Sequence, residues 1–238
     1  MAETQDLGTK EAAMKCVNPH NVEDKLGILQ YTPEGTPYLT VPASQIRTDV
    51  PIYITPHFKG DEPANVEMLS DERVNWNLIS PPWPYGMKDA EWWIDHNLST
   101  PELRFALSVL RAYHPGPEGT QIGGIDLHPT SKAGRGALDL VSGGAKEQEL
   151  GYLLHTAWQG KGIMKAAVKE MLRYGTDILG ADIIIRVTTV NTASTKLVEG
   201  MKGWQRLPER DGEIAWPVNK GGGDMREVKI WKWVGSSS

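Results

Sequence analysis

Residues 149–173 read ELGYLLHTAWQGKGIMKAAVKEMLR, and this stretch decides the fold. Its first six residues predict a strand, and residues 159–162 predict a glycine-containing loop. From Ile163 onward, Met164 and Val168 begin an apolar face at helical spacing, which predicts a long helix. Backbone N–H groups of such a loop, with the positive end of the helix behind it, suit a phosphate or pyrophosphate. A tight turn without a ligand is the alternative that the local residues leave open.

The loop differs from two common phosphate-binding motifs. A P-loop carries Ser or Thr after its Gly-Lys pair, whereas Gly160-Lys161 is followed by Gly162. The dinucleotide pattern G-x-G-x-x-G is also absent from this loop. Neither motif therefore explains it.

Composition predicts a packed globular domain. The chain has 238 residues, with 25 Lys and Arg against 30 Asp and Glu, so its formal net charge is −5. Hydrophobic residues at 39% and charged residues at 23% exclude wholesale disorder. The mild acidity and the lack of a dense Lys/Arg run argue against a nucleic-acid partner. No apolar run approaches the roughly 20 residues that cross a bilayer, so no membrane partner is expected.

The sparse cysteines and histidines restrict the chemistry. Cys16 is the single cysteine, which rules out an intramolecular disulfide and favours a reducing, cytoplasmic location. The N-terminus carries acids where a targeting peptide would carry bases. The histidines show no H-E-x-x-H spacing, so we expect no metal. Covalent catalysis is disfavoured because Cys16 lies in the N-terminal part and no G-x-S-x-G occurs.

The pattern of prolines, glycines and apolar residues divides the chain into three parts. We expect an irregular extension over residues 1–49, one domain over 50–234 and a flexible tail over 235–238. Within the domain, the pattern predicts a proline loop at 80–86 and a hairpin turn at 114–117. The expected helices are 61–69, 89–97, 163–178 and a short one from 191 to near 203. The expected strands are 52–54, 103–110, 121–127, 149–155, 183–187 and 227–233.

Several short motifs occur together in a recognisable order. They are Ile52-Tyr53-Ile54-Thr55-Pro56, Pro82-Trp83-Pro84-Tyr85 with Asp89-Ala90-Glu91, Ile122-Gly123-Gly124-Ile125, Glu149-Leu150-Gly151-Tyr152, Gln159-Gly160-Lys161-Gly162, and Asn191-Thr192-Ala193-Ser194 with Gly203-Trp204. In this order the chain resembles the GNAT superfamily of acyl-CoA-dependent N-acetyltransferases, in its RimJ/RimL-type branch, over about residues 50 to 234. The resemblance implies a mixed, mostly antiparallel α/β sheet flanked by helices and splayed into a V between residues 149–155 and 182–188.

The same resemblance implies a coenzyme site and acetyl-CoA as co-substrate. The loop from Gln159 to Met164 is similar to the family's Q/R-x-x-G-x-G/A pyrophosphate cradle, with Met164 in place of the small final residue. The residues implied to contact the coenzyme are Leu153, Leu154, His155, Gln159, Gly160, Lys161, Gly162, Ile163, Met164, Asn191 and Ser194. Pantetheine is an extended chain with amides, so an open strand edge is a natural partner for it.

Acetyl transfer needs a base for the amine and a proton for the departing thiolate. Glu149 matches an acidic position that some superfamily members use as base, although it also suits a plain surface strand. Asp126 and Glu209 are weaker alternatives. Ser194 would protonate the thiolate or hold the thioester sulfur, and helix capping is its alternative role. Many relatives carry a tyrosine four positions later, where this chain has Val198, and the oxyanion would fall to a backbone N–H near Leu153.

Aromatic residues suggest the acceptor side. Trp83 and Tyr85 lie in the proline loop and Trp93 lies in the helix predicted after it, and they could wall a substrate pocket or simply pack the core. We therefore expect acetyl transfer from acetyl-CoA to a primary amine of a small molecule, by direct attack in a ternary complex. A protein amino terminus as acceptor and a non-catalytic acyl-CoA-binding module are the alternatives. Residues 1–49 could cover the acceptor site or a dimer face, so a homodimer stays open.

Overall fold

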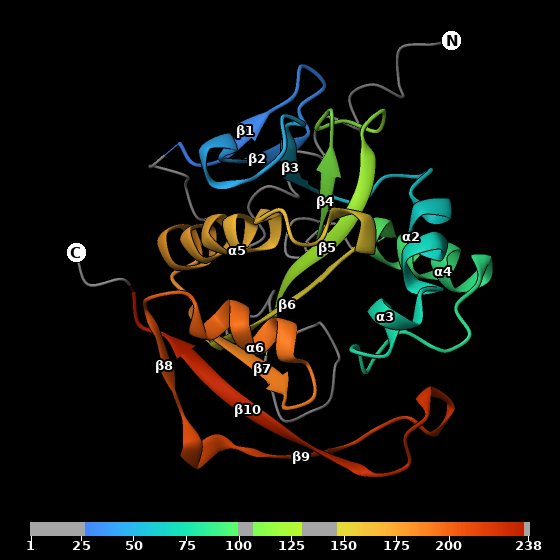
Figure 1. Ribbon diagram of the computed structural model, residues 1–238. Coiled ribbons are helices and arrows are strands. Elements are labelled where there is room, and N and C mark those ends of the chain that lie inside the picture. Colours follow the sequence, from blue (N-terminus) through green and yellow to red (C-terminus); the bar gives the residue numbers. More distant parts are fainter. Residues whose placement is uncertain (1–26, 100–106, 130–146, 236–238) are drawn as a thin grey trace.

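A ten-stranded sheet forms the centre of the computed structural model, which describes residues 27–99, 107–129 and 147–235 (Figure 1). Its order is β1-β2-β3-β4-β5-β6-β7-β10-β8, and β9 pairs with β10 outside this path. Each described pair is antiparallel except β6 with β7, which is parallel. The strands are β1 Gln30–Tyr31, β2 Pro37–Val41, β3 Ile52–Thr55, β4 Leu107–Ala112, β5 Thr120–Pro129, β6 Glu147–Leu154, β7 Asp182–Thr188, β8 Trp204–Arg206, β9 Gly212–Ala215 and β10 Met225–Trp233.

Helices cover both faces of this sheet. The α-helices are α2 Glu62–Leu69, α3 Glu72–Asn75, α4 Met87–Ser99, α5 Ile163–Arg173 and α6 Thr192–Glu199. Alternation along β6 shows which helices lie on which face. Leu150 and Leu154 pack in the core beneath α5, whereas Leu153 packs against the cluster of α2 that contains Met68. The expected α/β fold with a mostly antiparallel sheet is thus confirmed.

The helix after the glycine loop is the best-predicted element. α5 begins at Ile163 as expected and buries its apolar face, in which Val168 and Leu172 are 0% and 2% exposed. It changes into a π-helical turn, Tyr174–Ile178, within the range predicted as helix. The short helix after Asn191 ends at Glu199, before the predicted end near Gly203. Of the strand expected over 103–110, residues 103–106 lie outside the described ranges.

The described part of the N-terminal extension is regular where we expected irregular structure. β2 pairs with β3, and β1 pairs with β2, so residues 30–41 extend the sheet. Leu39 and Val41 are buried in the main core, while Thr40 between them is exposed. This alternation is that of a half-buried strand, and the nearby prolines lie at its ends or outside it.

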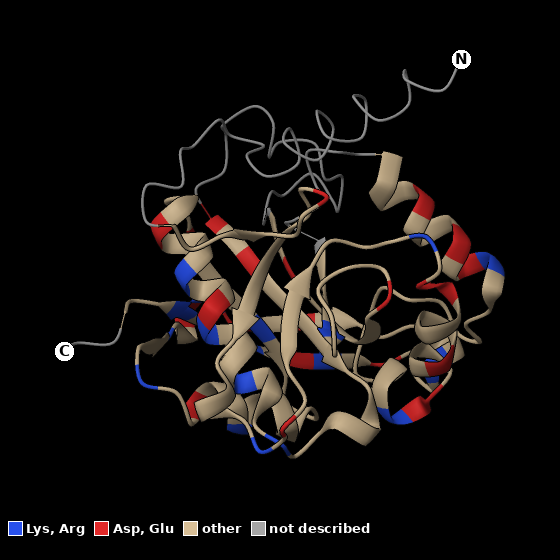
Figure 2. Cartoon of the chain, turned by 90° about the horizontal axis from the view of Figure 1, so that it is seen from above, with Lys and Arg blue, Asp and Glu red and all other residues tan. Residues whose placement is uncertain are grey.

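The outer surface carries mixed charge. Figure 2 shows Lys and Arg interspersed with Asp and Glu over the elements visible from above, without a continuous basic stripe. Among the described residues, no helix has the length and apolar character needed to span a membrane. The short strands β8 and β9 and the one-turn helix α3 were not predicted, because each has too few residues to show a period.

Candidate active site

Strands β6 and β7 begin side by side and then separate. Their parallel pairing covers Glu147 with Asp182, Gln148 with Ile183 and Glu149 with Ile184. Beyond that point β6 stays paired with β5, and β7 stays paired with β10. Figure 1 shows β6 and β7 diverging from this region, which is the expected V. Glu149 therefore lies at the apex of an opening between two parts of one sheet.

The separation leaves backbone groups of β6 facing the opening. The N–H of His155 donates to the carbonyl of Ile122 at 2.9 Å. Because N–H groups alternate along an antiparallel strand, the N–H of Leu153 points toward β5, and those of Tyr152 and Leu154 point toward the V. The Leu154 carbonyl accepts a hydrogen bond from Gln159 Nε2 at 2.9 Å. The N–H groups of Tyr152 and Leu154 thus offer donors to an extended ligand or to an oxyanion near Leu153.

A cavity of about 770 Å³ runs through this region. Residues of both strand pairs line it, together with α2, α4, the start of α6 and the hairpin of β9 and β10. Of the residues singled out in the sequence, those that line it are Tyr85, Trp93, Asp126, Glu149, Leu153, Asn191 and Ser194. Its volume is that of a small-molecule site.

Two segments close the cavity on the side of the hairpin. The proline-containing segment 77–82 forms one wall, and Ile214 and Trp216 of the hairpin contribute to the other. The buried Lys220 Nζ donates to the carbonyl of Leu78 at 2.6 Å, which ties the tip of the hairpin to this segment. Asn219 Nδ2 donates to the carbonyl of Trp83 at 2.8 Å. These bonds hold the two walls together.

Four ionisable side chains form a chain of contacts at the apex of the V. Arg186 Nε donates to Glu149 Oε2 at 2.7 Å, so Glu149 is held in an ion pair. His128 lies directly opposite Glu149 on β5, with Nε2 at 3.7 Å from Oε2. His128 Nδ1 is 3.4 Å from Asp126 Oδ1. The imidazole of His128 thus lies between the carboxylates of Asp126 and Glu149.

Electrostatics raise the pKa of His128 in this cluster. Burial lowers the pKa of His128, but the hydrogen bond and charge of Asp126 and the charge of Glu149 outweigh it, while Arg186 opposes them. The net pKa is raised above its ordinary value. His128 can therefore carry a proton between the two acids, a role that the sequence did not suggest because no spacing marks it.

Gly151 makes room for Asp126. The two residues face each other across β5 and β6, and a Cβ atom on Gly151 would lie 2.3 Å from Asp126 Oδ1. Any larger residue would displace the carboxylate. The glycine of the Gly151-Tyr152 motif is thus explained by the acid opposite it.

Ser194 and Tyr152 meet across the V. Ser194 lies in the first turn of α6, where its N–H donates to Asn191 Oδ1 at 3.1 Å. The capping role that was its alternative belongs to Asn191, so the Ser194 hydroxyl is not the cap. Burial raises the pKa of Tyr152 to about 12, and the adjacent Ser194 side chain opposes that rise. A protonated phenol thus lies beside Ser194, although Val198 occupies the family's tyrosine position.

The loop before α5 has the conformation of an anion cradle. Gly160 and Gly162 have φ of 74° and 82°, values that favour glycine. Gly162 is the N-cap of α5 and supplies no side-chain cap, so the first N–H groups of the helix lack partners within it. No atom lies within 4 Å of a Cβ built at Gly160, which leaves the outer side of the loop accessible. This geometry fits the pyrophosphate of a coenzyme.

The N-terminal segment contacts this loop. Arg47 N donates to the carbonyl of Lys161 at 2.8 Å, and its guanidinium donates to the carbonyl of Gly160. A Cβ on Gly162 would lie 3.0 Å from the carbonyl oxygen of Gln45. Arg47 therefore adds a cation beside the loop, a contribution that sequence spacing could not reveal.

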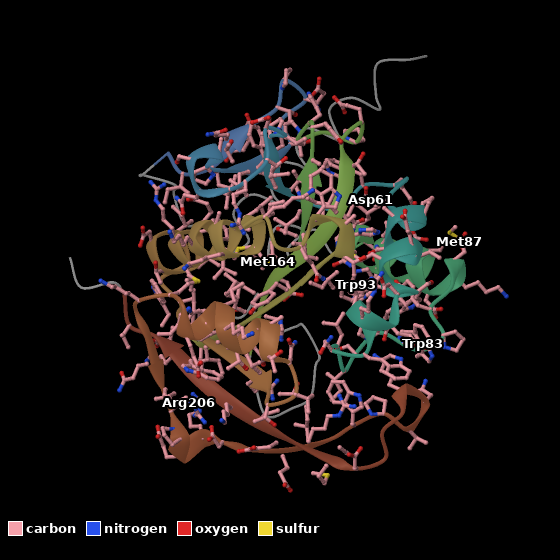
Figure 3. The ribbon with its side chains drawn as sticks, in the orientation of Figure 1. Asp61, Trp83, Met87, Trp93, Met164 and Arg206 are labelled. Atoms are coloured by element: carbon pink, nitrogen blue, oxygen red, sulfur yellow. The ribbon has the colours of Figure 1, made fainter. Side chains whose placement is uncertain are left out.

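Other expected coenzyme residues have structural partners. Ile163 and Met164 are buried in the core between α5 and the sheet (Figure 3). The methionine in place of the family's small residue is therefore a packing feature of α5. Leu154 is also buried in this core. His155 Nδ1 accepts from the N–H of Ala157 at 3.1 Å and caps the turn Thr156–Trp158. Lys161 Nζ lies over the ring of Trp158, 4.7 Å from its centroid.

The three expected acceptor residues have different positions. Tyr85 is buried with Met68 and lines the cavity. Trp93 lines it as well, with its ring 6.3 Å from that of His57. Trp83 packs edge-on against Trp76 at 6.2 Å and does not belong to the described lining. Figure 3 shows Trp93 nearer the middle of the molecule and Trp83 nearer the hairpin.

Glu209 and the question of a metal site are the remaining expectations. Glu209 lies in the exposed turn Pro208–Arg210, outside the described lining of the cavity. Its neighbour Arg210 pairs with Glu147 at 2.6 Å. Within the described ranges, no group of three or more acidic, histidine or cysteine side chains is arranged to hold a metal ion.

Comparison with known families agrees with this geometry. A family model described as an acetyltransferase (GNAT) domain matches residues 52–202, which is more than half of the chain. The chain belongs to the GNAT acetyltransferase family. None of the curated proteins matches this GNAT chain.

Solved structures show the same fold at low sequence identity. A GNAT acetyltransferase from Bacillus anthracis is 17% identical with a TM-score of 0.59, over 82% of this chain and 98% of that one. Spermidine N-acetyltransferase from Vibrio cholerae, in complex with CoA and spermine, is 16% identical with a TM-score of 0.56, over 76% and 94%. Ribosomal-protein-alanine N-acetyltransferase from Brucella melitensis is 16% identical with a TM-score of 0.53, over 76% and 98%. These likenesses establish the fold alone.

Proposed function

We propose that this GNAT protein transfers an acetyl group from acetyl-CoA to the primary amine of a small molecule, by direct attack in a ternary complex. The observation that carries the proposal is the separation of β6 from β7 at Glu149, which opens a cavity with an acid–base cluster at its apex. Cys16 as the single cysteine supports action in a reducing compartment such as the cytosol.

The donor would bind along the open edge of β6. The N–H groups of the Gly160–Met164 loop and the N-terminus of α5 suit its pyrophosphate, with Lys161 and Arg47 as flanking cations. The backbone of Tyr152 and Leu154 suits the amides of the pantetheine arm and the thioester oxygen. Asn191 and Ser194 lie across the opening from this edge. We expect Arg47→Ala to weaken acetyl-CoA binding severalfold, whereas Arg173→Ala at the far end of α5 leaves it unchanged.

The reaction can be written with these residues in named roles. The amine nitrogen attacks the thioester carbonyl carbon, the carbon–sulfur bond breaks, and the sulfur leaves as a thiolate. An alkylamine with a pKa of about 10 arrives mostly protonated, so it must first lose a proton. We assign that proton to Glu149, with Asp126 as the competing acceptor because its carboxylate lies over Gly151, nearer to Leu153. Ser194 or Tyr152 would supply the proton that the thiolate takes, and the second proton that the nitrogen loses as the amide forms would replace it.

A small acceptor suits the cavity better than a protein amino terminus. The bonds from Lys220 to the carbonyl of Leu78 and from Asn219 to that of Trp83 join the walls on one side, where they would obstruct an extended peptide. The RimJ/RimL-type branch that the sequence motifs suggest stays a proposal, and it does not decide the acceptor.

The deciding experiment measures release of free coenzyme thiol from acetyl-CoA across a panel of primary amines and short peptides. The proposal predicts saturable, amine-dependent release, with peptides weaker than small amines. Release that is slow and independent of the amine would support a non-catalytic acyl-CoA-binding module instead. Glu149→Gln and Asp126→Asn then identify the base, because the correct variant loses turnover while its affinity for acetyl-CoA is retained.

A further inference from the structure

Three buried polar side chains line the cavity on the side of α2, away from the V. They are His57, which follows β3, Asn65 on α2 and Gln121 near the start of β5. Their exposed fractions are 6%, 3% and 7%. Each has one atom without a hydrogen-bond partner: His57 Nδ1, Asn65 Nδ2 and Gln121 Oε1. Buried polar groups without partners are uncommon in proteins, so this group points to a ligand.

The two amides leave one donor and one acceptor free. Gln121 Nε2 donates to Asn65 Oδ1 at 3.1 Å, which uses one hydrogen-bonding group of each. The remaining pair is the Asn65 amide nitrogen and the Gln121 carbonyl oxygen. If both amides were turned over, the roles would exchange, and one donor and one acceptor would still remain. The pair therefore matches a group that both donates and accepts.

Neither the imidazole of His57 nor the buried ion pair that acts on it carries a net charge, and the carboxylates of Asp126 and Glu62 also act on His57. Burial lowers the pKa of His57 to about 4, so its imidazole is neutral at pH 7. The nearby ions Asp61 and Arg111 are buried together and hydrogen-bonded to each other at 2.7 Å and 2.9 Å. Each of these charges is therefore neutralised by the other. A neutral imidazole adds a further donor or acceptor to the site.

We propose that His57, Asn65 and Gln121 form a subsite for a neutral amide on the acceptor, so that the substrate is a small primary amine carrying a carboxamide. A carboxylate could only accept and would leave the Asn65–Gln121 pair half satisfied. An ammonium group could only donate and would also leave the pair half satisfied, and burying either ion costs free energy unless the ion is paired. A methyl group would satisfy none of the three atoms. The proposal rests on the function proposed above, because it assumes that the cavity binds the acceptor.

A matched series of amines tests this class of substrate. Each probe has a primary amine, a linear spacer of varied length and one of four end groups: carboxamide, carboxylate, ammonium or methyl. Both kcat/KM and the Kd of each probe for the coenzyme-loaded protein are measured. At the best spacer length, we expect the carboxamide to have a kcat/KM about 10-fold to 100-fold higher than each of the other end groups, and a Kd lower by a similar factor.

Two variants connect the preference to these residues. In Asn65→Leu/Gln121→Met, both amides become apolar side chains of similar size, so the carboxamide preference should fall at least about tenfold relative to methyl. In Gln121→Glu, an acid of the same shape should move the preference toward the ammonium probe. Unchanged acetyl-CoA affinity serves as the check that each variant is folded.

The outcomes separate the two proposals. Turnover of the series without a carboxamide preference would overturn this inference and leave the acetyltransferase function standing. Selective carboxamide binding without turnover would uphold the subsite and contradict the proposed reaction. Equal binding of all four end groups, or a preference that survives in both variants, would overturn the subsite.

Discussion

At the scale of single residues, Gly151 is the simplest test of the acid–base cluster. Its missing side chain leaves room for the Asp126 carboxylate, which a Cβ would approach to 2.3 Å. We therefore expect Gly151→Ala to lower kcat by about 10-fold to 100-fold, since small misplacements of reacting groups have effects of this size. Steady-state kinetics measure kcat, and a separate titration measures the affinity for acetyl-CoA.

Gly124 provides the matched control on the neighbouring strand. It also lines the cavity, but a Cβ there would meet its nearest neighbour, Leu153 Cγ, at an ordinary 3.6 Å. Gly124→Ala should therefore keep its kcat within about threefold of the wild type. Equal loss in the two variants would show that the position of Asp126 does not matter to the reaction.

The buried His57 should make stability depend on acidity. Its pKa is about 4 in the folded chain and 6.5 in the ordinary state, because burial lowers it against the opposing charge of Asp61. Below pH 6.5 the unfolded chain binds a proton that the folded chain does not, so stability falls as the pH falls toward 4. Over this range the titration of His57 lowers the free energy of unfolding by about 3 kcal/mol, at 1.36 kcal/mol per pKa unit.

Denaturant unfolding at several pH values checks this expectation. The free energy of unfolding of the wild type should fall more steeply between pH 6.5 and 4 than that of His57→Phe, which has no group to titrate there. Parallel curves would mean that His57 titrates normally in the folded protein. Arg111, Asp61, Glu62 and Asp126 also influence His57, and all four are unchanged in the variant.

At the scale of elements, the β9–β10 hairpin completes the acceptor cavity through Lys220. Its buried ammonium donates to the carbonyl of Leu78 and lies 3.5 Å from that of Asn75. Lys220→Met would leave buried carbonyls without this donor, at a cost of about 1–3 kcal/mol. We expect a higher KM for the amine and an unchanged Kd for acetyl-CoA. Asn219→Ala, at an exposed contact of the same tip, should have a smaller effect, and the reverse ranking would contradict this account.

Elements with long periodic patterns could be predicted from the sequence, and short ones could not. α5 has a sustained apolar face, so its start at Ile163 was predicted to the residue. The strand β9 has four residues, and the closure that it helps to make depends on Lys220 far along the chain from Leu78. Tertiary contacts of this kind leave no local pattern.

In the candidate site too, residues in local motifs could be predicted, and residues that depend on tertiary contacts could not. Glu149 and Ser194 could be named because they sit in recognisable motifs. The roles of His128, Tyr152 and the Asn65–Gln121 pair could not be predicted, because they depend on contacts that the fold makes between residues far apart in the sequence. Gln121, for example, meets Asn65 across 56 positions of sequence.

At the scale of the whole molecule, the described N-terminal segment belongs to the main core. Leu39 and Val41 have exposed fractions of 1% and 2%, and they pack with residues of β4, β5 and α5. Truncation of a buried leucine to alanine commonly costs about 2–5 kcal/mol, a large share of the about 5–15 kcal/mol that stabilises a typical domain. We therefore expect Leu39→Ala to lower the free energy of unfolding by about that amount, and Thr40→Ala, on the exposed face, by less than about 1 kcal/mol.

Removing the segment as a whole should have a larger effect than any single substitution. A chain that begins at Asp49 lacks β1 and β2, the five buried side chains Ile28, Leu29, Leu39, Val41 and Ile46, and Arg47 beside the coenzyme loop. At about 1.5–3 kcal/mol for each buried aliphatic side chain, the loss rivals the total stability of a domain. The shortened chain should therefore fail to unfold cooperatively and should not bind acetyl-CoA, as measured by calorimetry and circular dichroism. A stable, coenzyme-binding chain from residue 49 would instead show that the GNAT domain begins where the family match begins, and that the N-terminal strands are an addition to it.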